Sequence, residues 1–224
     1  MSDVSHSAPE VTAKDVDEML DRVVLREDPV LDETRAVSVA AGLPPIEVSP
    51  QSAHLLGLLV RMSGAKRVLE IGTLGGYSTT CLARAVGGDG TVVTLEYEPR
   101  HAEIAAANLA RAGVADRVQI VVGAALDTLP TLRGEFDFVF IDADKENNAA
   151  YVQWAIDFAH PGTVIVVDNI IRTGRVLHPA PNDRQAAAVR DTLEMMGRHP
   201  RLDTAAIQTV GLKGWDGFAL ALVT

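Results

Sequence analysis

Residues 136–145 read FDFVFIDADK, and this stretch decides the fold, because an apolar run stops there at a cluster of charged side chains. The run from Phe136 to Ile141 has the composition of a strand that is buried on both faces of a parallel sheet. A second run of this kind, TVIVVDN at 163–169, ends in Asp168 and Asn169. If the two runs are neighbouring parallel strands, their polar ends meet at one edge of the sheet.

Further short runs rich in Val and Ile alternate with helical stretches along the chain. They read RVLEIG (67–72), TVVTLE (91–96) and RVQIVVG (117–123). Near the C-terminus, DTAAIQTV (203–210) and GFALALV (217–223) flank GLKGWD, a hairpin-type connection. This order predicts an α/β fold with a doubly wound, mostly parallel, seven-stranded sheet of the Rossmann-like kind.

Additional helices are predicted before the first strand. Apolar residues recur at helical spacing after Thr12, which is a plausible N-cap, and two more helices are expected over 29–41 and 50–62. Residues 1–10 are small and polar and are predicted to form a flexible tail. Residues 11–224 are expected to form a single domain.

Composition restricts the partners and the compartment. The 224 residues include 30 acidic and 20 basic side chains, for a formal charge of −10, which argues against a nucleic-acid partner. The single cysteine, Cys81, permits no intramolecular disulfide. The N-terminus lacks the basic and apolar regions of a secretory signal, and no apolar run reaches the ~20 residues that span a bilayer. We therefore expect a cytoplasmic protein without a membrane partner.

The segment VLEIGTLGGYS (68–78) leaves a strand and enters a helix. Glycines let the backbone approach a ligand, and the helix N-terminus offers free N–H groups to an anion. The segment lacks the G-x-G-x-x-G fingerprint of dinucleotide sites, and a plain strand-to-helix turn remains an alternative. Glu96, at the end of the next strand, suits ribose hydroxyls, or is a solvated strand-end charge. Small residues at Gly123–Ala125 leave room for an adenine ring, or reflect ordinary close packing.

Asp142, Asp168 and Asn169 form the predicted metal site. Oxygen ligands of this type suit Mg²⁺ first, with Mn²⁺ and Ca²⁺ as alternatives, whereas Zn²⁺ favours His and Cys. The alternative is that the strand-end aspartates cap helices. Lys145 is a candidate general base, or else an exposed loop lysine. In the sequence none of the six histidines forms a ligand-like pair with an acidic neighbour, and His54 and His178 are candidates only for lining the site.

From about Asp15 to its C-terminus the chain resembles the cation-dependent O-methyltransferases that use S-adenosylmethionine, the group of the plant caffeoyl-CoA O-methyltransferases and related bacterial enzymes. The resemblance rests on VLEIGTLGGYST, TLEYEPRHAEIAAANLARAG, FDFVFIDADKENNAAY and GTVIVVDN. Animal catechol O-methyltransferase is similar at a greater distance. The resemblance implies a class I methyltransferase fold and a homodimer.

The resemblance also implies roles for individual residues. The methionine part of the cofactor is expected to contact Val48, Glu70, Gly72 and Ser78. Glu96 is expected to bind the ribose, Ala125 to contact the adenine, and Asp144 to make a further contact with the cofactor. Thr73, Gly76, Tyr77 and Asp142 complete the expected cofactor site. Asp142, Asp168 and Asn169 correspond to the metal ligands, and Lys145, beside Asp142, to the catalytic base.

The chain departs from the family pattern at two places. Plant enzymes carry a Trp-Asn pair shortly after the Asp-Asn ligands, where this chain has Arg172 and Thr173, so CoA esters become doubtful acceptors. The helix after Val48 begins SPQSAH and lacks the Gln-Gly pair expected of bacterial relatives. The entrance beside it is therefore expected to differ.

The predicted reaction is metal-dependent transfer of a methyl group from S-adenosylmethionine to a hydroxyl of a catechol-like small molecule. A divalent cation that binds both oxygens of a vicinal diol lowers the pKa of the attacking hydroxyl and orients it. Two alternatives are an NAD-linked oxidoreductase and a non-catalytic protein that binds a nucleotide cofactor.

Overall fold

The computed structural model describes residues 11–224, so the predicted tail, residues 1–10, lies outside the described residues. One seven-stranded sheet runs through the molecule in the order β3-β2-β1-β4-β5-β7-β6. Its strands are β1 (Arg67–Ile71), β2 (Thr91–Glu96), β3 (Val118–Val122), β4 (Phe136–Ile141), β5 (Ala159–Asp168), β6 (Leu202–Gly211) and β7 (Gly214–Val223). Strands β1 to β5 pair in parallel, whereas β7 is antiparallel to both β5 and β6. The predicted sheet and its C-terminal hairpin are confirmed.

Strand β5 begins at Ala159, earlier than the predicted start at Thr163. A register shift lies between Phe136 and Phe138 on the neighbouring β4, and Ala159 pairs with Phe136. The hydroxyl of Thr163 bridges this irregularity, since it donates to the carbonyl of Phe136 at 2.8 Å and accepts the backbone N–H of His160. Because Pro161 and Gly162 are residues that usually end a strand, the sequence gives no sign that the strand begins before them.

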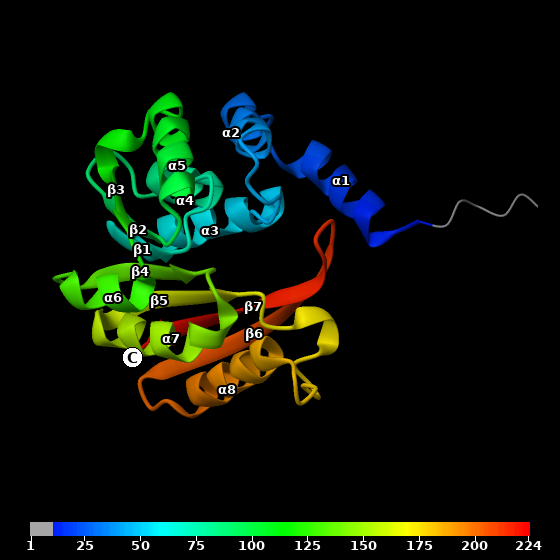
Figure 1. Cartoon of the computed structure of the whole chain (residues 1–224), viewed down its shortest axis with the longest axis vertical. Coiled ribbons are helices and arrows are strands. Elements are labelled where there is room, and N and C mark those ends of the chain that lie inside the picture. The colour runs from blue at the N-terminus through cyan, green and yellow to red at the C-terminus, as the bar shows by residue number, and fades with distance from the viewer. Residues whose placement is uncertain (1–10) are drawn as a thin grey trace, which may run out of the picture.

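Helices cover both faces of the sheet (Figure 1). Helices α3, α4 and α5 lie on one face, and α6, α7 and α8 lie on the other. The helices are α1 (Ala13–Val24), α2 (Pro29–Ala40), α3 (Pro50–Ser63), α4 (Tyr77–Ala85), α5 (Pro99–Arg111), α6 (Ala125–Thr128), α7 (Asn148–Asp157) and α8 (Arg184–Arg198). Within residues 11–224 no helix is long and apolar enough to cross a lipid bilayer.

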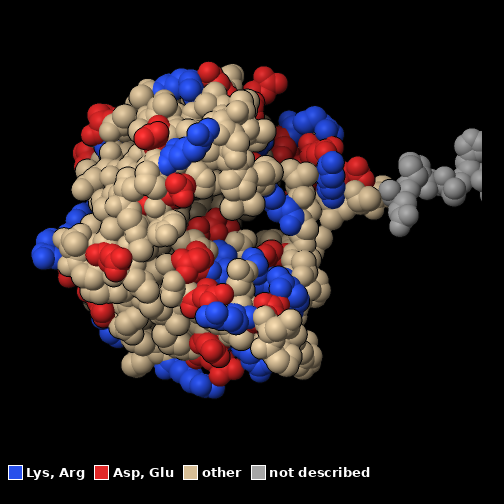
Figure 2. All heavy atoms as spheres, in the orientation of Figure 1, with Lys and Arg blue, Asp and Glu red and all other residues tan. Residues whose placement is uncertain are grey.

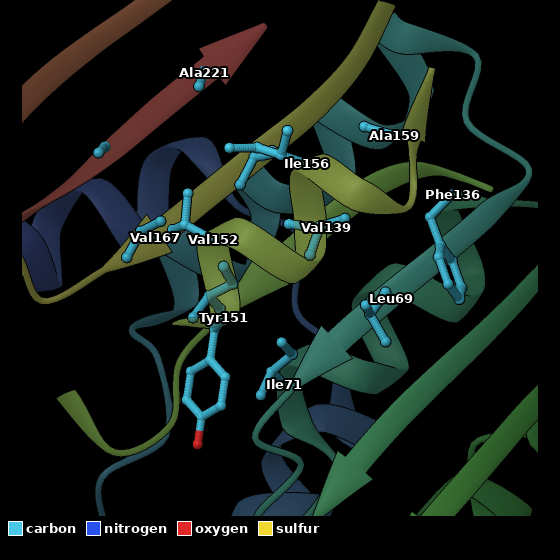
Figure 3. Packing of buried hydrophobic residues seen from close by; sticks show 14 of the residues in the cluster. Leu69, Ile71, Phe136, Val139, Tyr151, Val152, Ile156, Ala159, Val167 and Ala221 are labelled. Atoms are coloured by element: carbon cyan, nitrogen blue, oxygen red, sulfur yellow. The ribbon is translucent and has the colours of Figure 1, made fainter. Parts of the chain in front are cut away.

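The alternation of side chains along the strands builds two cores. On β1, Leu69 and Ile71 join the cluster under α7, whereas Val68 joins the cluster under α3 and α4. Figure 3 shows the first cluster, in which Val152 and Ile156 of α7 pack against the sheet. Because successive residues face opposite sides, Glu70 falls on the α4 face, inside the protein.

The N-terminal helices are present as predicted. The hydroxyl of Thr12 accepts the backbone N–H of Asp15, and the carboxylate of Asp15 accepts the backbone N–H of Thr12, which forms a capping box for α1. Helix α1 lies beside the β6–β7 hairpin, where Asp17 accepts the backbone N–H of Leu212 at 2.6 Å. Gln51 of α3 donates to Asp21 of α1 at 2.9 Å. These contacts position the N-terminal helices above the carboxyl ends of the strands.

Candidate functional site

A cavity of about 1190 Å³ opens at the carboxyl ends of β1, β2, β4 and β5. The N-terminal helices and the β6–β7 hairpin complete its walls, and Figure 2 shows acidic and basic side chains gathered around the hollow. Most predicted site residues line it, namely Val48, Gly72, Thr73, Tyr77, Ser78, Glu96, Ala125, Asp142, Asp144, Lys145, Asp168 and Asn169. The crevice beyond the strand ends is where open α/β sheets bind their ligands.

Two predicted site residues do not line the cavity. Glu70 is fully buried on the α4 face, where its carboxylate accepts hydrogen bonds from the hydroxyls of Ser78, Thr79 and Thr94. Burial raises the pKa of Glu70 to about 7, although the three hydroxyls act in the opposite direction. Gly76 is the N-cap of α4, with φ at 80°. Both residues lie next to the glycine loop on the side away from the cavity.

The glycine loop passes close to the end of β4. Gly72 has φ at 105°, and a Cβ atom at this position would lie against the backbone carbonyl of Asp142. The backbone N–H of Asp142 in turn donates to the carbonyl of Ile71 at 2.9 Å. Glycine is required here because a side chain would push the loop away from the strand that carries Asp142.

Glu96 lies at the end of β2 and is nearly buried. Its Oε2 atom accepts the backbone N–H groups of Thr73 and Leu74 at 3.2 and 2.7 Å. His101 Nδ1 lies 3.4 Å from Oε1. The carboxylate therefore connects the second strand to the glycine loop at the cavity wall.

Asp142 and Asp168 lie side by side at the ends of β4 and β5. Ile141 pairs with Val167 in the parallel register, so the two aspartates that follow stand next to each other. Burial, and then the nearby Asp142 carboxylate, raise the pKa of Asp168 to about 7. Asn169 follows with φ at 60°, a left-handed conformation that asparagine tolerates better than most residues. Two carboxylates and an amide thus share one edge of the cavity.

Lys145 extends back toward this pair from a 3₁₀ turn, Lys145–Asn147. Its Nζ atom donates to Asp142 Oδ1 at 2.8 Å, and its side chain is only 7% exposed. The alternative of an exposed loop lysine is therefore wrong. Lys145 is the ammonium group that the structure brings to the two aspartates.

Sequence reasoning missed several residues of the cavity wall. Tyr151 of α7 donates from its hydroxyl to Asp144 Oδ1 at 2.5 Å, a contact that spacing along the chain does not reveal. The guanidinium of Arg35 lies 4.9 Å from the centre of the Tyr77 ring. His101 lines the cavity, whereas the two histidines considered from the sequence, His54 and His178, do not.

The turn after Asn169 is held from β7. The Oδ1 atom of Asp216 accepts the backbone N–H groups of Ile171, Arg172 and Gly217 at 2.9 to 3.1 Å. Arg172 and Thr173 both have positive φ within this turn, at 54° and 55°. Asp216 lines the cavity as well, and no sequence motif pointed to it.

Within residues 11–224 no three His, Cys, Asp or Glu side chains form a group that could hold a metal. The edge described above has two carboxylates, from Asp142 and Asp168, and its third oxygen belongs to the amide of Asn169. A cation site of this composition would need further oxygen ligands from water or from a bound molecule, as Mg²⁺ sites commonly have.

Comparison with known proteins agrees with this architecture. The sequence pattern of the O-methyltransferase family matches residues 21–222. A catechol O-methyltransferase of Mycobacterium tuberculosis is 63% identical over 210 residues, which cover 93% of this chain and 95% of the relative.

Two similar crystal structures contain a cofactor or its product. An O-methyltransferase from Bacillus cereus, in complex with S-adenosylhomocysteine, is 45% identical with a TM-score of 0.93, covering 95% of this chain and 98% of the other. The O-methyltransferase TomG of Streptomyces achromogenes, in complex with S-adenosylmethionine, is 44% identical with a TM-score of 0.91, covering 95% and 97%.

These matches confirm the resemblance inferred from the sequence and the class I methyltransferase fold that it implied. They do not favour an oxidoreductase or a non-catalytic binding protein. The chain therefore belongs to the family of S-adenosylmethionine-dependent O-methyltransferases.

Proposed function

We propose that this enzyme transfers the methyl group of S-adenosylmethionine to one hydroxyl of a catechol-like small molecule. The reaction is proposed to require a divalent cation, for which Mg²⁺ is the preferred candidate. The observation that carries the proposal is the convergence of Asp142, Asp168 and Asn169 at one cavity edge beside the glycine loop. The naming of the Mycobacterium tuberculosis relative as a catechol O-methyltransferase supports the acceptor class.

The residues present fit a hard divalent cation. Two carboxylates and an amide supply oxygen donors only, and few ligands in a wide cavity leave room for acceptor oxygens. Two adjacent carboxylates repel each other, and a divalent positive charge would remove that repulsion. When bound, such an ion would lower the pKa of a catechol hydroxyl.

The chain's own groups would do the remaining work. Lys145 is proposed to accept the proton of the attacking hydroxyl once its ammonium group has released a proton, because its Nζ atom lies at the same cavity edge as Asp142. Glu96 is proposed to bind the ribose, Ala125 to contact the adenine, and Val48, Gly72, Thr73, Tyr77 and Ser78 to contact the methionine part, with a further contact from Asp144. Glu70 and Gly76 would act by supporting the loop. Holding the hydroxyl in line with the methyl group supplies much of the acceleration.

The proposal is tested with Asp168→Ala, assayed for methylation of catechol at saturating Mg²⁺. Turnover should be abolished while calorimetric binding of S-adenosylmethionine persists. Asp157→Ala, at the exposed end of α7, is the matched control and should retain turnover. Wild-type activity should also vanish in EDTA and return with Mg²⁺. Near-normal turnover by Asp168→Ala, or in EDTA, would contradict the metal role.

A homodimer is proposed as well. Helix α1 buries none of its residues, and Val16, Met19, Val23 and Val24 are at least 40% exposed. An apolar helix face of this kind commonly marks a protein interface. Light scattering coupled to gel filtration measures the mass directly, and a monomer at micromolar concentration would refute the proposal.

A further inference from the structure

Most cationic side chains that line the cavity have an acidic partner. Lys145 lies 2.8 Å from Asp142, and Arg35 and Lys213 lie 3.1 and 3.7 Å from the same glutamate, Glu47. Each of these three cations thus has a carboxylate oxygen within 4.0 Å, although Arg35 and Lys213 share one.

Arg172 is different. It lines the same cavity as Asp168 and Asn169, yet among residues 11–224 no carboxylate oxygen lies within 4.0 Å of its guanidinium nitrogens. Its Nη2 atom donates to the amide oxygen of Gln185 at 2.6 Å. Its Nε atom is buried and has no hydrogen-bond partner in the described part of the chain. The guanidinium of Arg172 thus lines the cavity beside the proposed metal site without an ion-pair partner within 4.0 Å in that part of the chain, and its Nε atom, like that of Arg35, is closed off from the cavity space.

The backbone of Arg172 is held in place by the fold. Its φ of 54° is uncommon for a residue with a side chain, and such conformations persist only where the surroundings enforce them. Asp216 enforces this one, since its Oδ1 atom accepts the backbone N–H of Arg172 at 3.1 Å. The same oxygen accepts two further backbone N–H groups, so this carboxylate is engaged with the backbone.

The neighbouring Arg175 provides an internal comparison. It lies in the same segment but forms an ion pair with Asp183, and it does not line the cavity. Arg175 is therefore a surface cation with an ion-pair partner, whereas Arg172, three positions earlier in the sequence, lines the cavity without one among the described residues.

We propose that Arg172 binds a carboxylate carried by the methyl acceptor, so that the acceptors of this enzyme are catechols with an acidic substituent. The planar guanidinium presents several N–H donors in a geometry that matches a carboxylate. This inference rests on the proposed function, because it names the acceptor class of the same site. It assigns to Arg172 the selection of the acceptor and no part in the chemical step.

The test compares two acceptors of equal size and different charge, 3,4-dihydroxybenzoate and 3,4-dihydroxybenzamide, at saturating S-adenosylmethionine and Mg²⁺. The wild-type enzyme should have the higher kcat/KM for the benzoate. In Arg172→Gln the ratio of the two kcat/KM values should fall roughly 10- to 100-fold, mainly through KM for the benzoate, as expected for hydrogen bonds to a charged group. Arg172→Lys should retain part of the ratio, and the control Arg198→Gln, at the exposed end of α8 and outside the cavity, should retain all of it.

A second measurement needs no variant. Added NaCl should raise the wild-type KM for the benzoate more than that for the benzamide, because salt screens the attraction between the charges. Equal kcat/KM values for both acceptors in the wild type, or an equal loss for both in Arg172→Gln, would overturn the inference and leave the proposed function standing. If the wild type methylates neither acceptor with Mg²⁺ present, the proposed function itself fails.

Discussion

A carboxylate oxygen of Asp216 accepts the backbone N–H of Ile171 at 2.9 Å, although the two residues lie 45 positions apart in the chain. Because Ile171 follows Asn169 by two residues, strand β7 fixes the turn on which the proposed metal ligand sits. The position of a ligand at the end of β5 therefore depends on a side chain from another strand.

Asp216→Ala should weaken the response to the metal. The turn loses two hydrogen bonds, so Asn169 is no longer held, and the Mg²⁺ concentration for half-maximal activity should rise by about 10- to 100-fold. Asp216→Asn keeps an acceptor oxygen at the same place and should recover most of the affinity. A Mg²⁺ titration of initial rates measures both variants. Equal effects of the two substitutions would show that the charge of Asp216, and not its hydrogen bonds, is what matters.

Glu70→Gln should change how stability depends on pH. The pKa of Glu70 is raised in the folded protein from 4.5 to about 7, so the folded state binds more protons than the unfolded state between these values. The stability contributed by protonated Glu70 is present below pH 4.5 and is lost as the pH rises through 7, a change on the order of 3 kcal/mol. The glutamine side chain does not titrate, so the free energy of unfolding of the variant does not fall in this way as the pH rises.

Urea unfolding of both proteins at pH 5 and pH 8, without cofactor or metal, measures the effect. The difference in unfolding free energy between wild type and variant should shift in favour of the variant at pH 8. Other titrating groups, Asp168 among them, contribute to both proteins and cancel in this comparison. A difference that is the same at both pH values would contradict the raised pKa.

Glu96→Gln should weaken cofactor binding. If the carboxylate binds ribose hydroxyls, its loss should raise the Kd for S-adenosylmethionine by roughly 10- to 100-fold, as for other hydrogen bonds to charged groups. Glu98→Gln, two residues away and exposed, serves as the control. Calorimetry gives both constants. An unchanged Kd in Glu96→Gln would restrict Glu96 to its observed contacts with the backbone of Thr73 and Leu74.

Gly72→Ala should destabilise the protein by about 1–3 kcal/mol, because φ at this position is 105° and a methyl group meets the Asp142 carbonyl. Gly88→Ala is a matched control, since nothing lies within 4 Å of its Cβ position. Its unfolding free energy should change by less than ~0.5 kcal/mol. Thermal unfolding distinguishes the two. Equal stability of the two variants would mean that the loop can move away from β4 without loss.

The strands and the aspartates at their ends were accessible to sequence reasoning, because a run such as 138–141 (FVFI) is apolar throughout and Asp142 ends it abruptly. Parallel strands then bring Asp142 and Asp168 together without further information. The three N-terminal helices followed from spacing and from caps such as Thr12.

The environment of Glu70 was not accessible in this way. Its three hydroxyl partners come from α4 and β2, and only the packed structure shows that they enclose the carboxylate and keep it from the cavity. The same holds for Asp216 and Arg172. A side chain that holds a distant turn leaves no local signal in the sequence.

Strand β7 is the last strand of the chain, yet it lies inside the sheet between β5 and β6. Val223, next to the C-terminal Thr224, is only 1% exposed. The acceptor side of the cavity can therefore form only after β7 has been synthesised. Removal of residues from β7 would open the middle of the sheet instead of trimming its border.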